Sequence, residues 1–492
     1  MEYDLCIIGA GAAGITIARE FVHSRVTVGL IESGGLEPDL ETLSLYEGET
    51  SETIPSSFQY LTTSRVRYFG GTTNVWNGWT RPLDPLDFRP RKWVGDSGWP
   101  IDGDDLAEFY ERAARICQVP GFRDEANPVD PEEQDRLLDR SSKLVTKLFH
   151  YSPPTRFGKV YRKELNNSKN VSVHLHANAT DLRLDQAGKF MKEVEIRTIS
   201  GRRYLVRAKA FIIACGGIEN ARLLLSSRGV QKNGVGNQFD MVGRYFMEHP
   251  HILMADAVLD ASRNLGPYID RFAHHSLIHE ARKILSPTQS LQEERRILNF
   301  AVLIRRNAPP LTDEDSLLAR LIGNTKRELR KSRVELRVEQ APDPENRVVL
   351  SDRKDRFGNS LPKLVWKMNP IDLLTAREGL RIFANELGAN DLGRVKSLRD
   401  NFERHSHDPP DFGTGCLTLW HHHMGGTRMH ADPRRGVVDS DCKVHGVANL
   451  YVAGSSVFPT SGFANPTLTI VALATRLADE VKAQLTRLGN HA

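Results

Sequence analysis

Short runs of apolar residues, each ending in a glycine or a charged residue, recur along the chain and predict buried strands. They are Asp4 to Ile8 (DLCII), Val26 to Ile31 (VTVGLI), Ala210 to Ala214 (AFIIA) and Leu450 to Ala453 (LYVA). Runs of about four to eight apolar residues bounded by turn signals are typical of parallel strands that are buried on both faces. We therefore expect segments far apart in the sequence to share one parallel sheet.

Helical and alternating patterns lie between and after these runs. Ile218 to Leu225 (IENARLLL) has helical periodicity, and an apolar helix is expected from Pro466 through Leu477, with Asn465 as its N-cap. Val334 to Gln340 (VELRVEQ) instead alternates between apolar and polar residues, which is typical of a sheet strand. The patterns together predict an α/β fold, with a discontinuous Rossmann-type domain and an α+β domain that contains an antiparallel sheet.

Length and composition fit an ordinary globular protein with two lobes that share a cleft. Apolar residues make up 40% and charged residues 26% of the 492 residues, enough to close a large core. The net charge of +4, from 66 basic and 62 acidic residues, is too even to indicate a nucleic-acid partner. No run reaches the roughly 18 apolar residues of a membrane span, and the first strand begins too early for a signal peptide. We therefore expect a cytoplasmic protein without a membrane anchor.

Cysteine usage agrees with that expectation. The five cysteines lack the spacing of a disulfide framework or a zinc site, and they are Cys6, Cys117, Cys215, Cys416 and Cys442. A reducing compartment fits this pattern.

The first apolar run leads directly into a glycine fingerprint. Gly9, Gly11 and Gly14 stand in G-x-G-x-x-G spacing, with Ala12 and Ala13 between them, and the order is strand, turn, helix. The first glycine permits the tight turn, the second lets the backbone approach a pyrophosphate, and the third lets the helix pack on the strand. Glu32 closes the second strand, where its carboxylate can accept both ribose hydroxyls. The fingerprint predicts a bound dinucleotide, and by itself it leaves NAD and FAD both open.

Later segments of the chain are expected to line the same cofactor site, which favours the longer cofactor, FAD. Arg67 to Trp79 (RYFGGTTNVWNGW) predicts a loop whose small residues press the backbone against a flat ring system. Two further strands end in small residues of the same kind, and the helix that starts at Pro466 and Thr467 could stabilise the negative charge of a reduced flavin. The residues predicted to hold the cofactor in these segments are Gly70, Gly71, Thr72, Asn74, Val75, Cys215, Gly216, Gly454, Ser455, Asn465, Pro466 and Thr467.

Five segments in chain order resemble the glucose-methanol-choline (GMC) oxidoreductases, and the resemblance covers nearly the whole chain. They are GAGAAG with Glu32, the GGTTNVWNG loop, VGRYFMEHP (Val242 to Pro250), HMGGTRM (His423 to Met429) and NLYVAGSSVFPTSGFANPT (Asn449 to Thr467). The stretch from Glu339 to Gly358 also resembles the substrate domain of this family. The resemblance implies an FAD-dependent enzyme that oxidises an alcohol to a carbonyl.

The same resemblance implies an active site that pairs a histidine in an H-x-x-G-[ST] setting with a second histidine or an asparagine. His423 fits the first position and Asn465 the second. This pairing is most similar to the pyranose-oxidase and fructose-dehydrogenase branch, which implies a sugar, glycoside, aminoglycoside or polyol substrate. Covalently flavinylated pyranose oxidases have a histidine before the tryptophan of the GG loop, whereas here Val75 precedes Trp76. We therefore predict FAD bound without a covalent link.

Alcohol oxidation removes a proton from oxygen and a hydride from carbon, so the site needs a base and an electron acceptor. We predict that His423 takes the hydroxyl proton, since the ordinary pKa of histidine is about 6.5, while the hydride passes to flavin N5. Asn465 is predicted to orient the hydroxyl. Consecutive residues of an extended segment point alternately, so His421 and His422 are expected to pack or face substrate, and no metal is predicted.

Other functions stay open on the sequence. The substrate could be a non-sugar alcohol, such as a steroid or an aryl or alkyl alcohol, or the protein could be a lyase that retains FAD. A flavin-binding module without catalysis is also conceivable, and an NAD-linked dehydrogenase is disfavoured by the returning segments. Oxygen or another acceptor would take the electrons, and a homo-oligomer is compatible with the sequence.

The expected division of the chain follows from these assignments. The FAD-binding domain comprises residues 1–100, 161–250 and 416–492, and the last part carries the active-site residues. Residues 101–160 form a connecting or substrate-domain segment, and residues 251–415 form the substrate-binding domain.

Overall fold

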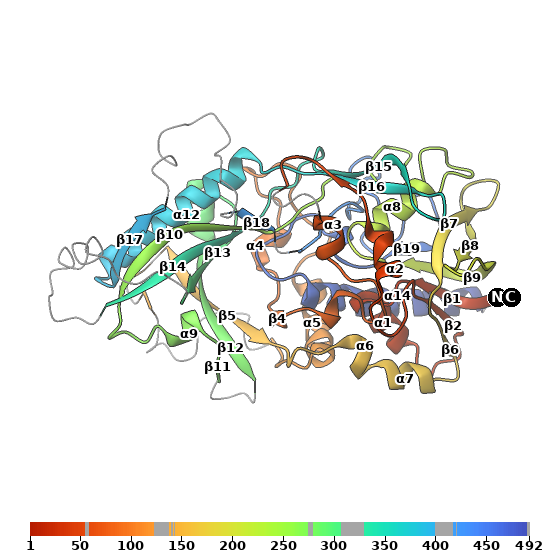
Figure 1. Ribbon diagram of the computed structural model, residues 1–492, viewed down its shortest axis with the longest axis horizontal. Helices are drawn as coiled ribbons and strands as arrows, with labels where there is room; N and C mark the ends of the chain where they lie inside the picture. The colour runs from red at the N-terminus through yellow and green to blue at the C-terminus, as the bar shows by residue number, and fades with distance from the viewer. Residues whose placement is uncertain are drawn as a thin grey trace.

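The computed structural model shows two lobes, each built on one large sheet (Figure 1). It describes residues 1–54, 59–122, 137–138, 141, 143–273, 279–306, 329–398, 417–419 and 421–489. Both chain ends lie in the lobe that contains β1 (Glu2–Ile8), at the right of Figure 1. The predicted fold class, a parallel-rich sheet of Rossmann type beside an antiparallel sheet, is confirmed.

The first sheet assembles strands from distant parts of the chain. Its order is β6 (Val171–His174), β2 (Val28–Ile31), β1, β9 (Arg203–Ile213), β8 (Met191–Arg197) and β7 (Asn178–Leu184), and β19 (Leu450–Val452) also pairs with β9. The β1, β2, β6, β9 and β19 pairings are parallel, whereas β7, β8 and β9 form an antiparallel extension. Leu5, Cys6 and Ile7 are fully buried, as expected for a central strand covered on both faces.

Helices cover this sheet and present their N-termini to its carboxyl edge. They are α1 (Ala12–Glu20), α8 (Glu219–Ser226) and α14 (Thr467–Gly489), and α14 packs against α1 and α5 (Asp104–Cys117). The first hydrogen bond of α14 runs from the Ile470 N–H to the carbonyl of Pro466, so Pro466 rather than Asn465 is the N-cap. The prediction of Asn465 as the cap is wrong by one residue, and its side chain is free to point elsewhere.

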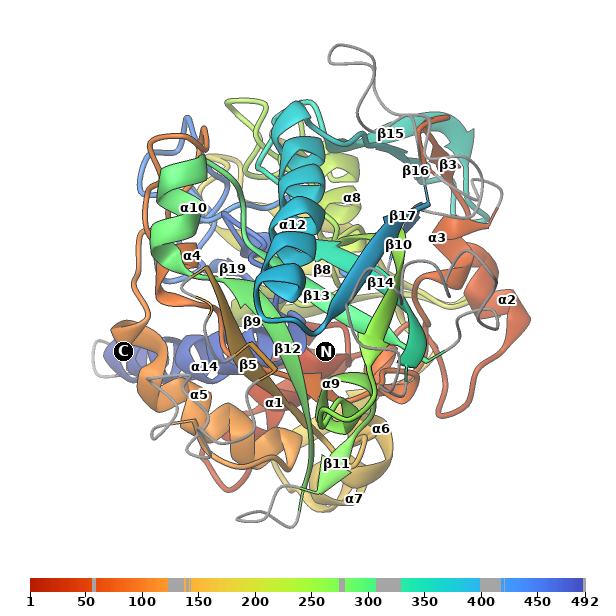
Figure 2. The same ribbon diagram turned by 90° about the vertical axis from the view of Figure 1, so that its left-hand side faces the viewer.

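The second sheet is antiparallel throughout its described pairings. Its order is β17 (Gly393–Ser397), β10 (Pro250–Asp260), β14 (Leu329–Val338), β13 (Phe300–Arg305), β12 (Glu280–Pro287), β5 (Leu144–Tyr151) and β4 (Trp79–Thr80). Two short strands complete it, β18 (Leu417–Leu419) beside β10 and β11 (Phe272–Ala273) beside β12. The alternating run VELRVEQ lies in β14, as its pattern predicted. Figure 2 shows α12 (Pro370–Ala389) lying across the outer face of this sheet.

Smaller elements complete the fold. A third sheet contains β15 (Arg347–Lys354), β16 (Ser360–Val365) and β3 (Glu49–Thr50). The remaining short helices are α2 (Leu40–Leu43), η1 (Ser44–Tyr46), α3 (Tyr60–Thr63), η2 (Gly71–Asn74), α4 (Pro85–Phe88), α6 (Phe157–Val160), α7 (Arg162–Asn167), α9 (Gly266–Ile269), α10 (Gln289–Arg295) and η6 (Ser455–Val457). In the described part of the chain, no helix combines the length and apolar character needed to cross a membrane.

Candidate active site

A cavity of about 590 Å³ runs from the carboxyl edge of the first sheet to the face of the second. The glycine turn after β1 lines one end, and Trp79, Arg337 and Asn465 line the other. Most residues predicted to hold a cofactor lie on its wall: Gly9, Gly11, Ala12, Ala13, Glu32, Gly71, Thr72, Val75, Cys215, Gly216, Gly454, Ser455, Asn465, Pro466 and Thr467. The structure therefore brings segments from the whole length of the chain to one cavity.

Three predicted residues lie behind that wall and shape it. A Cβ on Gly14 would stand 1.8 Å from the carbonyl oxygen of Gly9, so only glycine lets α1 pack this closely. Gly70 has φ +104°, and its N–H donates to the Ala10 carbonyl at 2.8 Å, which ties the GG loop to the first turn. Asn74 Nδ2 donates to the carbonyl of Phe69 at 2.9 Å and closes the same loop.

The glycine turn fits a dinucleotide. A Cβ on Gly9 would stand 2.4 Å from the Ala214 carbonyl oxygen, whereas a Cβ on Gly11 would meet nothing closer than Gly71 Cα at 4.0 Å. Gly11 therefore faces open cavity beside the N-terminus of α1, where unpaired N–H groups suit a pyrophosphate. The buried Glu32 carboxylate accepts the N–H groups of Ala10 and Gly34, each at 2.9 Å, and still borders the cavity. Its remaining lone pairs suit ribose hydroxyls.

At the far end of the cavity, Asn465 contacts His422 and not His423. Asn465 Nδ2 lies 3.2 Å from His422 Nε2, and Asn465 Oδ1 accepts a hydrogen bond from Arg337 Nη1 at 2.5 Å. Arginine can only donate, so the amide oxygen faces Arg337 and the amide N–H faces the imidazole. The sequence pairs Asn465 with His423, whereas the structure places the Asn465 amide beside His422, because adjacent side chains of this segment point to different sides.

His423 is engaged in a separate buried network. Its Nε2 lies 3.1 Å from Tyr60 Oη and 3.5 Å from Glu248 Oε1, and Tyr60 donates its hydroxyl proton to Glu248. The tyrosine oxygen must then accept from His423, so Nε2 of His423 carries a proton. Burial raises the pKa of Tyr60 well above its ordinary value, which keeps this hydroxyl protonated. His423 also borders the cavity, and with its Nε2 protonated the lone pair of the neutral ring lies on Nδ1.

The protonation state of His422 follows from its other neighbour, His249. The Gly462 carbonyl lies 2.8 Å from His249 Nε2 and can only accept, so that nitrogen carries the proton. Burial, and after it the charge of Arg337, lowers the pKa of His249 to about 3, so its Nδ1 is unprotonated. This Nδ1 lies 2.9 Å from His422 Nδ1, which must therefore donate. The lone pair of His422 is left on Nε2, beside Asn465.

A second chain of contacts fixes Asn465 from the side of β14. Arg337 Nε donates to His251 Nε2 at 2.7 Å, and His251 Nδ1 lies 2.6 Å from Glu335 Oε1. Because a carboxylate accepts, His251 donates to Glu335 and accepts from Arg337. Two independent chains thus converge on the pair formed by Asn465 Nδ2 and His422 Nε2, and both make Nε2 the acceptor.

Electrostatics keep His422 neutral. Burial lowers the pKa of His422 well below 6.5, and the charges of His249 and Arg337 lower it further. Burial likewise raises the pKa of Glu248 to about 7, against the hydrogen bonds that it accepts from Tyr60 and from the backbone N–H groups of His422 and His249. At neutral pH, His422 is therefore unprotonated and able to accept a proton.

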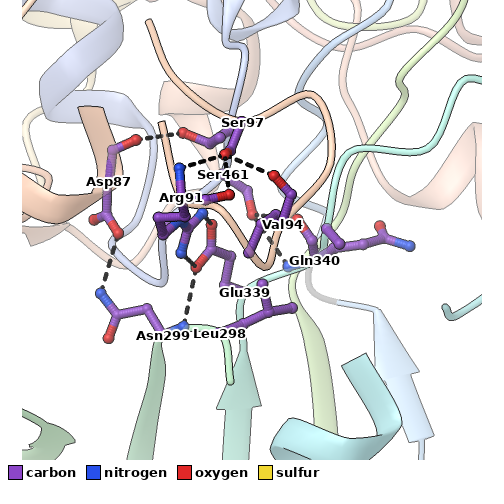
Figure 3. Close-up of polar contacts among 12 residues, drawn as sticks. Asp87, Arg91, Val94, Ser97, Leu298, Asn299, Glu339, Gln340 and Ser461 are labelled. Atoms are coloured by element: carbon purple, nitrogen blue, oxygen red, sulfur yellow. Dashed lines mark hydrogen bonds and ion pairs between the residues drawn. The ribbon is translucent and has the colours of Figure 1, made fainter. Parts of the chain in front are cut away.

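A buried polar cluster holds the two segments that carry these groups (Figure 3). Arg91 makes a bidentate ion pair with Glu339, in which Nη1 and Nη2 donate to the two carboxylate oxygens at 2.8 and 2.5 Å, and both side chains are fully buried. Glu339 directly follows β14, and the N–H of the next residue, Gln340, donates to Ser461 Oγ at 3.2 Å. Thr460 Oγ1 donates to the Asp87 carbonyl at 2.7 Å. The cluster therefore ties the end of β14 to the loop that contains Gly462 and Asn465.

A model of the GMC oxidoreductase family matches residues 342–474. The 6'''-hydroxyparomomycin C oxidase of Streptomyces lividus is 26% identical over 98% of this chain and 92% of its own length. The fructose dehydrogenase large subunit of Gluconobacter japonicus is 28% identical over 56% of this chain and 47% of its own. A structure of a formate oxidase variant from Aspergillus oryzae has the same fold, with 17% identity, a TM-score of 0.59 and 99% of each chain covered.

Sequence reasoning missed several residues of the site. Arg337, His249 and His251 lie on or beside strands of the second sheet, and Trp79 begins a strand of that sheet. One signal was available: the alternation of VELRVEQ places Arg337 on the same face of its strand as Glu335. His249 stands in the MEHP segment quoted above, but nothing local showed that its ring meets His422.

Proposed function

We propose that this chain is a GMC-type oxidoreductase acting on CH–OH donors, and that it oxidises a hydroxyl of a polyhydroxylated, sugar-type substrate with His422 as the base. The observation that carries the proposal is the pair of hydrogen-bond chains that leave the lone pair of His422 Nε2 beside Asn465 Nδ2. This replaces His423, whose Nε2 already donates to Tyr60.

Two neighbouring groups then act on one hydroxyl. The substrate hydroxyl donates to His422 Nε2 and accepts from Asn465 Nδ2, so it takes the place of the direct contact between these two side chains. Proton transfer to His422 leaves an oxygen with growing negative charge, which the Asn465 N–H and the nearby Arg337 guanidinium stabilise. Bound FAD supplies the acceptor for the hydride, at flavin N5.

The cavity supports FAD as the group that completes the site. Gly11, Glu32 and the start of α14 border it at positions suited to the pyrophosphate, the ribose and the flavin ring, respectively. Val75 lines the cavity with 55% of its surface exposed, and its side chain offers no nucleophile to the flavin. We keep the proposal that FAD is bound without a covalent link.

A sugar-type alcohol is supported by what relatives act on, according to their names: a paromomycin-type aminoglycoside in one and fructose in another. The pyranose-oxidase and fructose-dehydrogenase branch remains our proposal for the place of this chain in the family. A non-sugar alcohol is the second candidate, favoured by the apolar Trp79 and Leu419 on the cavity wall. A lyase that retains FAD would form product without bleaching the flavin.

The test is anaerobic stopped-flow reduction of the flavin in two matched variants, His422→Ala and His423→Ala, with a panel of sugars, glycosides, polyols and aryl alcohols. Because a general base contributes about 10²- to 10⁴-fold, His422→Ala should slow reduction by that factor. His423→Ala should stay within about tenfold of the native rate, because its ring nitrogen is not the acceptor. FAD content and melting temperature serve as controls for folding. The reverse ranking of the two variants would refute the assignment of the base.

A further inference from the structure

Arg337 is a buried cation that borders the substrate end of the cavity. Its side chain projects from β14, and only 1% of the residue's surface is exposed. Its Nε donates to His251 and its Nη1 donates to Asn465 Oδ1, and both of these acceptors are uncharged. Within the described ranges, no carboxylate is hydrogen-bonded to this guanidinium.

Buried charges in proteins are normally paired with an opposite charge, because an unpaired one is costly to remove from water. The closest candidate, Glu335, is already shared between His251 at 2.6 Å and Arg305 at 3.1 Å. The charge of Glu335 raises the pKa of Arg337, whereas Arg305 and Arg282 lower it, so two further cations share this one carboxylate with Arg337. Burial is the largest cause of the lowered pKa of Arg337, and at about 9 this pKa still leaves the guanidinium charged at neutral pH.

The carboxylates elsewhere on the cavity wall form hydrogen bonds or ion pairs with other groups and not with Arg337. Among the described lining residues, the acidic ones are Glu32 and Glu219. Glu32 accepts backbone N–H groups at the glycine turn, and Glu219 is paired with Arg65 at 2.9 Å and with Arg222 at 3.2 Å. The substrate end therefore presents a cation without a protein anion opposite it.

We infer that Arg337 forms an anion subsite and that the substrate is a hydroxy acid of sugar or polyol type, whose carboxylate pairs with Arg337 while its hydroxyl meets His422. The inference rests on the proposed function, since it names the class of alcohol that this site oxidises. Asn465 touches both Arg337 and His422, so the width of one amide group separates the anion subsite from the base. The carboxylate must then lie within a few bonds of the reacting carbon.

The geometry explains why a carboxylate is suited to this place. A guanidinium binds a carboxylate through two parallel N–H bonds, and such charge-assisted bonds strengthen in a buried site. The Arg337 guanidinium carbon lies 5.2 Å from the centre of the Trp79 ring, so an apolar surface shields the pair from water. Cationic aminoglycosides, the substrate type named for one relative, would bring like charge toward Arg337.

Binding is tested first, by titrating oxidised holoenzyme with acetate and with its uncharged analogue acetamide while recording the flavin absorption spectrum. Acetate should bind at least tenfold more tightly than acetamide, because hydrogen bonds to a charged group contribute about 1.5–3 kcal/mol, or about 10- to 100-fold. Arg337→Met should remove this preference, and Arg337→Lys should restore part of it. Arg333→Met, which removes the same charge from the same face of β14 outside the cavity, should leave it unchanged. Equal acetate binding in native enzyme and Arg337→Met would overturn the inference.

Turnover is tested with two pairs of substrates, glucuronate against glucose and glycerate against glycerol. The native enzyme should favour the acid of at least one pair in kcat/KM. Arg337→Met should reduce the ratio of acid to neutral kcat/KM by about 10- to 100-fold, mainly through KM. An equal fall in kcat/KM for the acid and the neutral substrate would mean that Arg337 stabilises only the reacting oxygen, which would overturn the inference. Arg337-dependent acetate binding without flavin reduction by any alcohol would support the anion subsite and refute the proposed oxidation.

Discussion

The relay from Gly462 through His249 to His422 makes a sharp prediction about a residue that does not touch the reacting oxygen. His249→Phe keeps an aromatic ring of similar size but removes both of its hydrogen bonds, at 2.8 Å to the Gly462 carbonyl and at 2.9 Å to His422 Nδ1. The buried Nδ1–H of His422 then has no acceptor, at a cost of about 1–3 kcal/mol. The imidazole can avoid that cost by moving its proton from Nδ1 to Nε2, but Nε2 then has no lone pair to accept the hydroxyl proton.

That energy range sets the size of the effect. Since about 1.4 kcal/mol corresponds to a factor of ten in rate, flavin reduction in His249→Phe should be about 5- to 150-fold slower at pH 7, with little change in substrate affinity. Anaerobic stopped-flow absorbance measures both quantities from the dependence of the reduction rate on substrate concentration.

Two further variants separate the proton relay from simple packing. Asparagine at this position can place an oxygen where Nδ1 lies, so His249→Asn should recover most of the rate. His249→Gln can replace only the bond to the Gly462 carbonyl, so it should stay slow. If glutamine rescues the rate as well as asparagine does, or if His249→Phe is as fast as native enzyme, the deduction about the tautomer of His422 is refuted.

Three other predictions follow from the structure. Because burial lowers the pKa of His422 well below 6.5, this ring should cause no fall in flavin reduction from about pH 8 down to 6; a midpoint in that range of a stopped-flow pH series that persists in Glu248→Gln would contradict this. Gly11→Val should give a folded but colourless protein, with less than about a tenth of the native FAD content and an unchanged circular dichroism spectrum, since its side chain would enter open cavity. Burial raises the pKa of Glu219, but the guanidinium groups of Arg222 and Arg65 lower it to about 2. This carboxylate therefore stabilises the fold above its unfolded pKa of about 4.5, and the stabilisation is lost as pH falls toward 2. Denaturant titrations should show a loss on the order of 3 kcal/mol over that range, and Glu219→Gln should flatten the pH dependence; an equal slope in the variant would assign it to other groups.

Features that depend on residues close in the sequence could be predicted, whereas contacts between distant segments could not. The strand, glycine turn and helix at the N-terminus are local, and Gly9, Gly11 and Gly14 take the positions that their spacing predicted. The alternation around Arg337 gave the strand but not the neighbour of the side chain, because Asn465 approaches it from 128 residues away in the sequence.

The contact between Asn465 and His422 could not be predicted for a related reason. A motif of consecutive histidines fixes the backbone path, but which ring meets Asn465 depends on which side of the segment faces the cavity. The helix also starts one residue later than expected, so Asn465 is not its cap, and the Asn465 amide lies beside His422. Neither fact can be obtained from spacing alone.

The two adjacent histidines need opposite protonation patterns, and Glu248 lies between their networks. One carboxylate oxygen accepts from Tyr60, which in turn accepts from His423, so that network ends in a protonated Nε2. The other oxygen accepts the backbone N–H groups of His422 and His249 at 3.0 Å each, which sets the two rings of the relay side by side. Because Tyr60 and Glu248 hold Nε2 of His423 as a donor, the ring nitrogen with a lone pair beside Asn465 is Nε2 of His422.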